Sequence, residues 1–105
     1  MYEYVVDGNV AVLTMNNGEN RFNFDSLKAF SAILDEIEGE DKVNALVTTS
    51  AHDKIWSNGI DLDWLLPAIQ KEGEALMDRF RRAMFTLFRR VLTFPMPTVA
   101  AMNGH

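Results

Sequence analysis

An amphipathic helix pattern enclosed by two strand-like stretches sets the topology of this chain. Residues 23–39 read NFDSLKAFSAILDEIEG, where apolar side chains recur at the spacing of one helix face, with Asn23 or Asp25 as the N-cap and Gly39 as the stop. Residues 42–50, KVNALVTTS, follow at once and are typical of a short strand buried inside a mostly parallel sheet. Strand, helix and strand in this order predict a right-handed crossover.

The chain before this unit is predicted to be a hairpin. Residues 2–6 and 10–15 alternate in the manner of strands, and Asp7-Gly8 between them is a favoured turn sequence. A hairpin followed by a helix and a further strand indicates an α/β fold.

The second half is predicted to be mostly helical. Residues 61–73 form a short helix that Pro67 kinks or limits, because proline lacks an N–H and clashes with the preceding turn. Residues 74–93 form a longer helix with one apolar stripe. Residues 98–102, TVAAM, are expected to be a final buried strand.

Composition excludes several classes of function. The net charge of −5 argues against a nucleic-acid-binding protein, which normally carries a basic face. The chain has no cysteine, so it has no disulfide and no thiolate metal site. No apolar run is long enough to cross a membrane, and the N-terminus does not resemble a signal peptide. We expect a cytoplasmic protein without metal ligands.

The sequence IWSNGIDLDW, residues 55–64, places a polar turn before the first turn of a helix. Gly59 permits a positive φ, and Asp61 is well placed as the N-cap. The N–H groups at such a turn are free, and the helix dipole adds positive charge there. If Ile60 acts through its N–H, it can stabilise an oxyanion or enolate. The alternative interpretation is a simple turn with a helix cap.

Three stretches together resemble the crotonase (enoyl-CoA hydratase/isomerase) superfamily. They are ENRFNFDSL at 19–27, IWSNGIDLDWL at 55–65 and FPMPTVAAMNGH at 94–105, in the order and at the separations usual for that superfamily. Within it, they are most similar to 3,2-enoyl-CoA isomerases of the plant peroxisomal type and their bacterial relatives.

The resemblance implies a crotonase-like spiral of ββα units, of which residues 1–105 are the N-terminal part of a single domain truncated after His105. It also implies a homo-oligomer, a trimer or a dimer of trimers, that binds an acyl-CoA thioester. Coenzyme A enters as part of the substrate, and no cofactor is needed.

The resemblance assigns a role to two groups of residues. It implies that the backbone N–H of Ile60 is the first of two oxyanion-hole donors to the thioester oxygen. It implies that the segment that contacts the nucleotide and pantetheine of coenzyme A, mostly through backbone atoms, is Arg21, Phe22 and Asn23. The residues that would line the thioester end are Ser57, Gly59, Asp61 and Leu62.

The implied activity is that of an enzyme of fatty acid metabolism, an enoyl-CoA isomerase that shifts a double bond from position 3 to position 2. The alternatives are an enoyl-CoA hydratase and a non-catalytic domain for CoA-ester binding or assembly. In the family, the second oxyanion donor and the catalytic acid follow the NGH landmark. We therefore expect the 105 residues alone to be catalytically silent.

Overall fold

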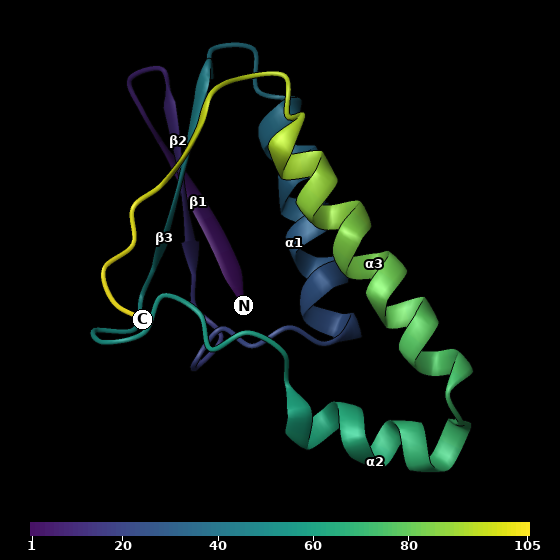
Figure 1. Ribbon diagram of the computed structural model, residues 1–105. Helices are drawn as coiled ribbons and strands as arrows, with labels where there is room; N and C mark the ends of the chain where they lie inside the picture. Colours follow the sequence, from purple (N-terminus) through teal and green to yellow (C-terminus); the bar gives the residue numbers. More distant parts are fainter.

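The computed structural model describes residues 1–105 as one mixed sheet covered on one face by helices (Figure 1). The elements in chain order are β1 (Tyr2–Asp7), β2 (Val10–Met15), α1 (Phe24–Glu38), β3 (Ala45–Ser50), α2 (Leu62–Glu72), α3 (Ala75–Leu92) and β4 (Thr98–Ala100). Strand order in the sheet is β1-β2-β3-β4. No helix combines the length and apolar character needed to cross a membrane.

The first half of the chain folds as the sequence predicts. Strands β1 and β2 pair antiparallel as a hairpin, and β2 pairs parallel with β3 after the crossover through α1. Asn23 caps α1 by a reciprocal pair of hydrogen bonds with Ser26, and the helix ends at Gly39. The two expected N-caps are thereby reduced to one, because the side chain of Asn23 accepts the Ser26 N–H at 2.9 Å.

The core lies between the sheet and α1. Every second residue of β2 and β3 is buried, while the alternate residues are only partly covered. The expectation of a fully buried 42–50 strand is therefore wrong for one face of the sheet. Helices cover a single face, so that period-two alternation decides which side chains enter the core.

The final strand is also less buried than expected. All three residues of β4 are exposed, and Val99 keeps 57% of its surface. Strand β4 lies at the edge of the sheet and pairs only with β3. The apolar groove described below lies between β4 and the end of α3, so α3 does not cover this strand. The prediction of a buried strand over 98–102 was wrong because burial depends on a covering layer that the local sequence does not report.

Helices α2 and α3 form an L-shaped arm that packs on α1 (Figure 1). Helix α2 continues through Pro67 to Glu72, so Pro67 does not end it. An aromatic cluster joins the arm to α1: Phe24 meets Trp64 at 5.2 Å and Phe80 at 5.8 Å between ring centroids, both edge to face. The start of α2, which follows the turn of residues 55–61, is thus held against the start of α1.

Candidate functional site

Two segments predicted to act together are paired in the structure. Phe22 and Ile60 form an isolated parallel bridge. The Phe22 N–H donates to the Gly59 carbonyl at 2.7 Å, and the Asp61 N–H donates to the Phe22 carbonyl at 2.9 Å. The Asn58 N–H extends this pairing by donating to the Glu19 carbonyl at 3.0 Å. The segments 19–23 and 57–62 therefore form one short ladder at the ends of β2 and β3.

The Ile60 N–H has no hydrogen-bond acceptor in the chain. In a parallel bridge the partner strand uses the groups on either side of the bridged residue, so the N–H and C=O of Ile60 point away from Phe22. Gly59, at φ 72°, makes the turn before it, and no atom lies within 4 Å of the position of a Cβ there. The conformation, rather than crowding, requires glycine at 59. The free N–H stands beside the N-terminus of α2, whose dipole favours an anionic partner.

The carboxylate of Asp61 is the N-cap of α2, as expected. Its Oδ1 accepts the Trp64 N–H at 3.3 Å, and its Oδ2 accepts from Asn23 Nδ2 at 3.0 Å. Asn23 caps α1 at the same time, so a single amide joins the starts of the two helices. The capping interpretation of Asp61 is confirmed by this geometry, and it coexists with the free N–H of Ile60.

Removing the Asn23 side chain is expected to lower the free energy of unfolding by about 1–2 kcal/mol, the usual cost of losing an N-cap. Asn23→Ala deletes both the bond to the Ser26 N–H and the bond to Asp61. Chemical denaturation checks this. Asn44→Ala, at an exposed asparagine whose side chain makes no hydrogen bond, is the control and should leave the midpoint unchanged.

Arg21 lies at the edge of the ladder in a small ionic cluster. Its Nη2 lies 2.6 Å from Glu19 Oε2, and its Nη1 lies 3.4 Å from Asp63 Oδ2. The hydrogen bond and charge of Glu19 raise the pKa of Arg21. Donation from Asn58 Nδ2, then from Arg21, lowers the pKa of Glu19. The Arg21 side chain is 36% exposed, so its guanidinium is partly accessible to solvent, although the expected contact of this segment with coenzyme A is mostly through backbone atoms.

Glu19 predicts a pH dependence at the acid end. Because its pKa is lower in the folded chain, ionised Glu19 stabilises the fold above its ordinary pKa of 4.5, and this contribution disappears as the pH falls through the lowered value. Glu19→Gln should therefore be less stable than the wild type above about pH 4.5, where ionised Glu19 contributes, and the two proteins should converge in stability as the pH falls through the lowered pKa. Urea denaturation of both proteins across this range measures the difference. An identical acid dependence in the two would contradict the pairing.

The remaining predicted residues differ in their exposure. Ser57 is partly buried and donates through Oγ to the Asn20 carbonyl at 2.8 Å, so its hydroxyl is occupied. Leu62 begins α2 and is 51% exposed. The ring of Phe22 turns inward and meets Phe88 edge to face at 5.7 Å. Of the predicted set, the backbone of Phe22 and Ile60 builds the site, and side chains serve mainly to hold that backbone.

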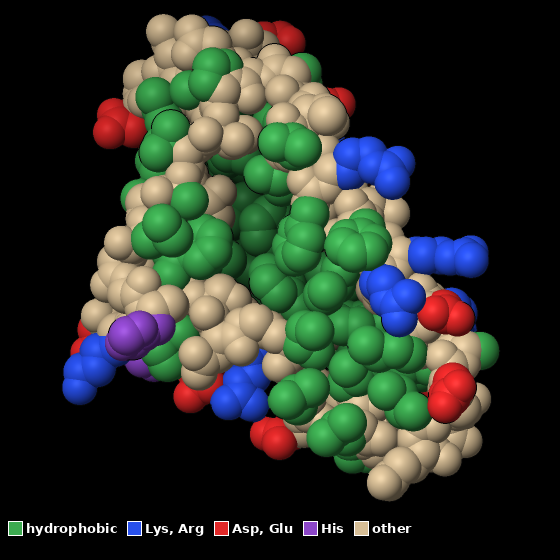
Figure 2. Space-filling view, viewed as in Figure 1, with side chains coloured by type: hydrophobic (Ala, Val, Ile, Leu, Met, Phe, Trp, Pro, Cys, Tyr) green, Lys and Arg blue, Asp and Glu red, His purple; other side chains and the backbone are tan.

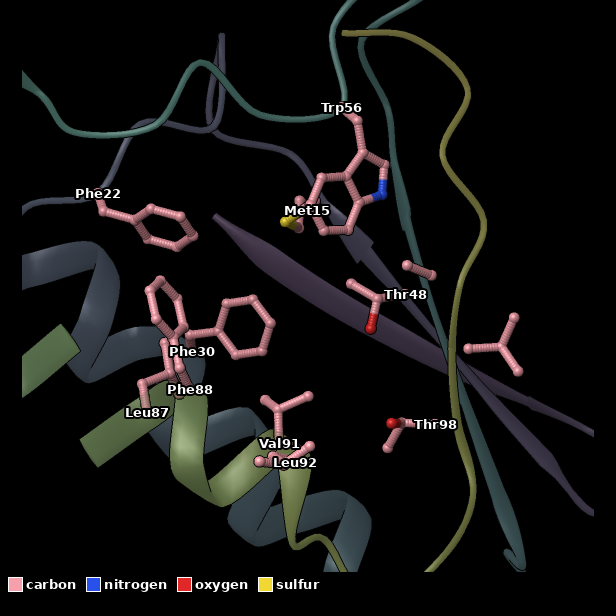
Figure 3. A pocket seen from close by; sticks show the side chains of 12 residues that line it. Met15, Phe22, Phe30, Thr48, Trp56, Leu87, Phe88, Val91, Leu92 and Thr98 are labelled. Atoms are coloured by element: carbon pink, nitrogen blue, oxygen red, sulfur yellow. The ribbon is translucent and has the colours of Figure 1, made fainter. Parts of the chain in front are cut away.

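An apolar groove of about 460 Å³ opens beside the ladder. Figure 3 shows side chains from the sheet and from α3 facing one another across it, with Phe22 and Trp56 at the end nearest the ladder. Ten of its twelve lining residues are hydrophobic. The space-filling view shows the same hollow running between the sheet and the arm (Figure 2). The ladder therefore borders a surface suited to an apolar group.

The C-terminal residues 103–105 lie on the loop that leads to Ile60. Asn103 Nδ2 donates to the His52 carbonyl at 2.8 Å. The His105 carbonyl accepts the Trp56 N–H at 2.5 Å and the Ser57 N–H at 3.0 Å. Gly104 passes so close to Lys54 that a Cβ would lie 2.2 Å from its carbonyl oxygen. The NGH motif thus makes backbone contacts with the loop.

Sequence reasoning missed the groups that fasten this loop. Asn20 donates to Ser50, and Asn58 donates to Glu19, across 30 and 39 residues of sequence respectively, so no local sequence pattern predicts these hydrogen bonds. No group of three or more histidine, cysteine or acidic side chains is arranged to hold a metal ion.

Fold and site together define a crotonase-like α/β protein. The sequence model of the family described as "Enoyl-CoA hydratase/isomerase" matches residues 6–105. The chain therefore belongs to the enoyl-CoA hydratase/isomerase family, and the resemblance found in its motifs is confirmed.

Several relatives can be compared directly. The chain is 33% identical to enoyl-CoA delta isomerase 2, peroxisomal, of Arabidopsis thaliana, over 93% of its own length and 42% of that protein. It is 37% identical to a putative enoyl-CoA hydratase of Thermus thermophilus, over 95% of its own length and 40% of that protein. The chain thus spans about two fifths of the length of the curated relatives it matches.

Solved structures agree on the fold. An enoyl-CoA hydratase/isomerase from Xanthobacter autotrophicus superposes with a TM-score of 0.83 at 26% identity, covering 95% of this chain and 37% of that one. An enoyl-CoA hydratase from Bacillus anthracis gives a TM-score of 0.83 at 21% identity, covering 98% of this chain and 40% of that one, and shows the shared fold alone.

Proposed function

We propose that this chain is the acyl-CoA-binding part of an enoyl-CoA isomerase that moves a double bond from position 3 to position 2. The observation that carries the proposal is the unpaired N–H of Ile60, held by the Phe22 bridge beside the N-terminus of α2. A fixed backbone donor of this kind polarises a thioester carbonyl and stabilises the enolate formed from it. The apolar groove beside the ladder is compatible with an acyl substrate.

The mechanism divides into polarisation and proton transfer. Ile60 and a second N–H donor bind the thioester oxygen, which lowers the cost of the enolate. A carboxylate then removes a proton from C2 and returns it to C4, so that the 3,4 double bond becomes a 2,3 double bond. Nothing is consumed, and no metal or redox cofactor is required. Coenzyme A enters only as part of the substrate.

The carboxylates nearest Ile60 are unsuited to the proton transfer. Asp61 is occupied by Asn23 and by the Trp64 N–H. Glu19 and Asp63 are paired with Arg21. We therefore propose that residues 1–105 supply thioester binding and one oxyanion donor but not the base, and that alone they do not turn over a 3-enoyl-CoA.

Relatives support the isomerase assignment without deciding it. The Arabidopsis relative described above is named an isomerase, as is a second one from the same organism at 32% identity. The alternative, hydration of a 2-enoyl-CoA, is favoured by the 37% identity to the putative Thermus hydratase. Both activities would use the same donor at Ile60.

Two parallel assays on the product of the complete gene separate these functions. With 3-hexenoyl-CoA, an isomerase yields 2-hexenoyl-CoA, seen by its conjugated absorbance and by NMR. With 2-hexenoyl-CoA, a hydratase yields 3-hydroxyhexanoyl-CoA, seen by mass spectrometry as addition of water. Dominant hydration would replace the isomerase assignment by the alternative, and absence of both reactions and of acyl-CoA binding would overturn both.

We also propose a cytoplasmic homo-oligomer, a trimer or a dimer of trimers. The exposed apolar side chains of the arm support assembly, among them Leu62, Leu66 and Phe85. Light scattering of the gene product measures the subunit number, and a monomer would contradict this part of the proposal.

A further inference from the structure

Asn20 is a buried polar residue at the centre of the hydrogen bonds that hold the loop of residues 51–61, between β3 and α2, here called the Ile60 loop. Only 1% of its surface is exposed, and it is the one non-glycine residue with positive φ, at 54°. Asparagine tolerates this left-handed conformation better than most side chains do. Its position between the end of β2 and the start of α1 places it under the loop that follows β3.

The carboxamide of Asn20 uses all its principal hydrogen-bonding positions. Oδ1 accepts the Asn17 N–H at 3.0 Å. Nδ2 donates to Ser50 Oγ at 2.8 Å and to the Trp56 carbonyl at 3.0 Å. Because a backbone N–H can only donate and a carbonyl can only accept, these partners fix which end is oxygen and which is nitrogen.

Ser50 extends the contact to the first part of the loop. Its Oγ, which receives the Asn20 donor, gives its own proton to the Ile55 carbonyl at 2.7 Å. It also accepts the His52 N–H at 3.0 Å. Asn20 and Ser50 together therefore bind three backbone groups of the loop between 52 and 56.

The backbone of Asn20 fastens the second part of the loop. Its carbonyl accepts from Ser57 Oγ, and that oxygen accepts the Gly59 N–H at 3.2 Å. The residue before Asn20 and the second residue after it, Glu19 and Phe22, then form the ladder with 58–61. The left-handed turn at Asn20 lets both neighbours face the same segment.

We propose that Asn20 is a positioning residue that sets the direction of the Ile60 N–H. It touches no substrate group, and acts by fixing the loop on both sides of Ser57. This inference rests on the function proposed for Ile60. It predicts that loss of the two Nδ2 donors releases the loop, while the sheet stays folded.

The decisive variant is Asn20→Asp, which keeps the shape and the tolerance of positive φ but replaces the two-proton donor by an acceptor. Asn44→Asp makes the same chemical change at an exposed position and is the matched control. Hydrogen exchange followed by NMR reports the amides of Asn58 and Asp61, both bonded in the ladder. We expect their exchange to rise by about tenfold to a hundredfold in Asn20→Asp, the loss expected when buried hydrogen-bond partners are removed. Amides of β2 should be unchanged, and Asn44→Asp should match the wild type throughout.

A second readout follows the Ile60 donor itself. Butanoyl-CoA labelled with ¹³C at the thioester carbonyl cannot isomerise, and its infrared band moves to lower frequency when the oxygen accepts a hydrogen bond. We expect a shifted band on the wild-type protein and on Asn44→Asp, and a band returned toward that of free butanoyl-CoA on Asn20→Asp.

Each outcome decides the inference. Unchanged exchange at Asn58 and Asp61, or an equal rise in all amides of the sheet, would overturn the positioning role. If Asn20→Asp does not fold, Ser50→Ala takes its place, because it removes the acceptor of Asn20 and the bond to Ile55 while leaving the turn intact. A wild-type protein that leaves the carbonyl band unshifted would overturn the function of Ile60, and the exchange measurement would still decide the role of Asn20.

Discussion

Replacing the amide of Ile60 by an ester is expected to lower kcat of the complete gene product by about 10²–10³-fold, the usual effect of losing one oxyanion donor. The ester keeps the isoleucine side chain, removes the N–H, and makes the Gly59 carbonyl a weaker acceptor of the Phe22 N–H. Because the Ile60 N–H has no partner in the chain, the only hydrogen bond affected is the one to Gly59, and the free energy of unfolding should change by about 1 kcal/mol or less. Semisynthesis with the hydroxy-acid analogue of isoleucine gives the variant, and steady-state assays with 3-hexenoyl-CoA measure the effect.

The same backbone change at Asn44 should give the reverse pattern. The Asn44 N–H donates to the Asn9 carbonyl at 2.8 Å, away from the ladder. Its loss should cost about 1 kcal/mol of stability and leave kcat unchanged. If the Ile60 ester retains wild-type kcat, the oxyanion function of this N–H is wrong.

Local sequence patterns were sufficient for the elements whose signals are short in range. The spacing of Leu27 to Ile37 and the Asn23 cap predicted α1, and Asp7-Gly8 predicted the hairpin. The IWSNGIDLDW stretch predicted the Asp61 cap because capping depends on the next three residues alone.

The ladder and its supports depend on contacts far apart in sequence. The bridge joins Phe22 to Ile60, and the bonds of Asn20 reach Ser50 and Trp56. Among the asparagines of the stretch NNGENRFN, no local signal marks Asn20 as the buried one. The motif resemblance identified the segments correctly. The hydrogen bonds that hold these segments together join residues far apart in sequence, and only the folded structure shows them.

Burial of the last strand shows the same limit. An apolar composition at Thr98–Ala100 is compatible with a core strand and with an exposed edge. Whether a second layer lies over β4 is a property of the rest of the fold, so composition alone gave the wrong result there.

Gly104→Ala is expected to displace the NGH segment from the loop and to lower the free energy of unfolding by about 1–3 kcal/mol, the cost of overpacking a close contact. The new Cβ would lie 2.2 Å from the Lys54 carbonyl oxygen and 2.8 Å from the Ile55 nitrogen. Both are backbone atoms, so no side chain can rotate away to make room. Denaturation measures the loss of stability.

Gly39→Ala is the matched control, since a Cβ there would meet its nearest atom at 3.5 Å and the residue has an ordinary helical φ of −79°. It should change stability by less than about 0.5 kcal/mol. Hydrogen exchange then locates the damage: in Gly104→Ala the amides of Trp56 and Ser57, which donate to the His105 carbonyl, should lose protection. Protected amides at both positions would mean that residues 103–105 do not hold the loop, and that Asn20 and Ser50 alone fix the approach to Ile60.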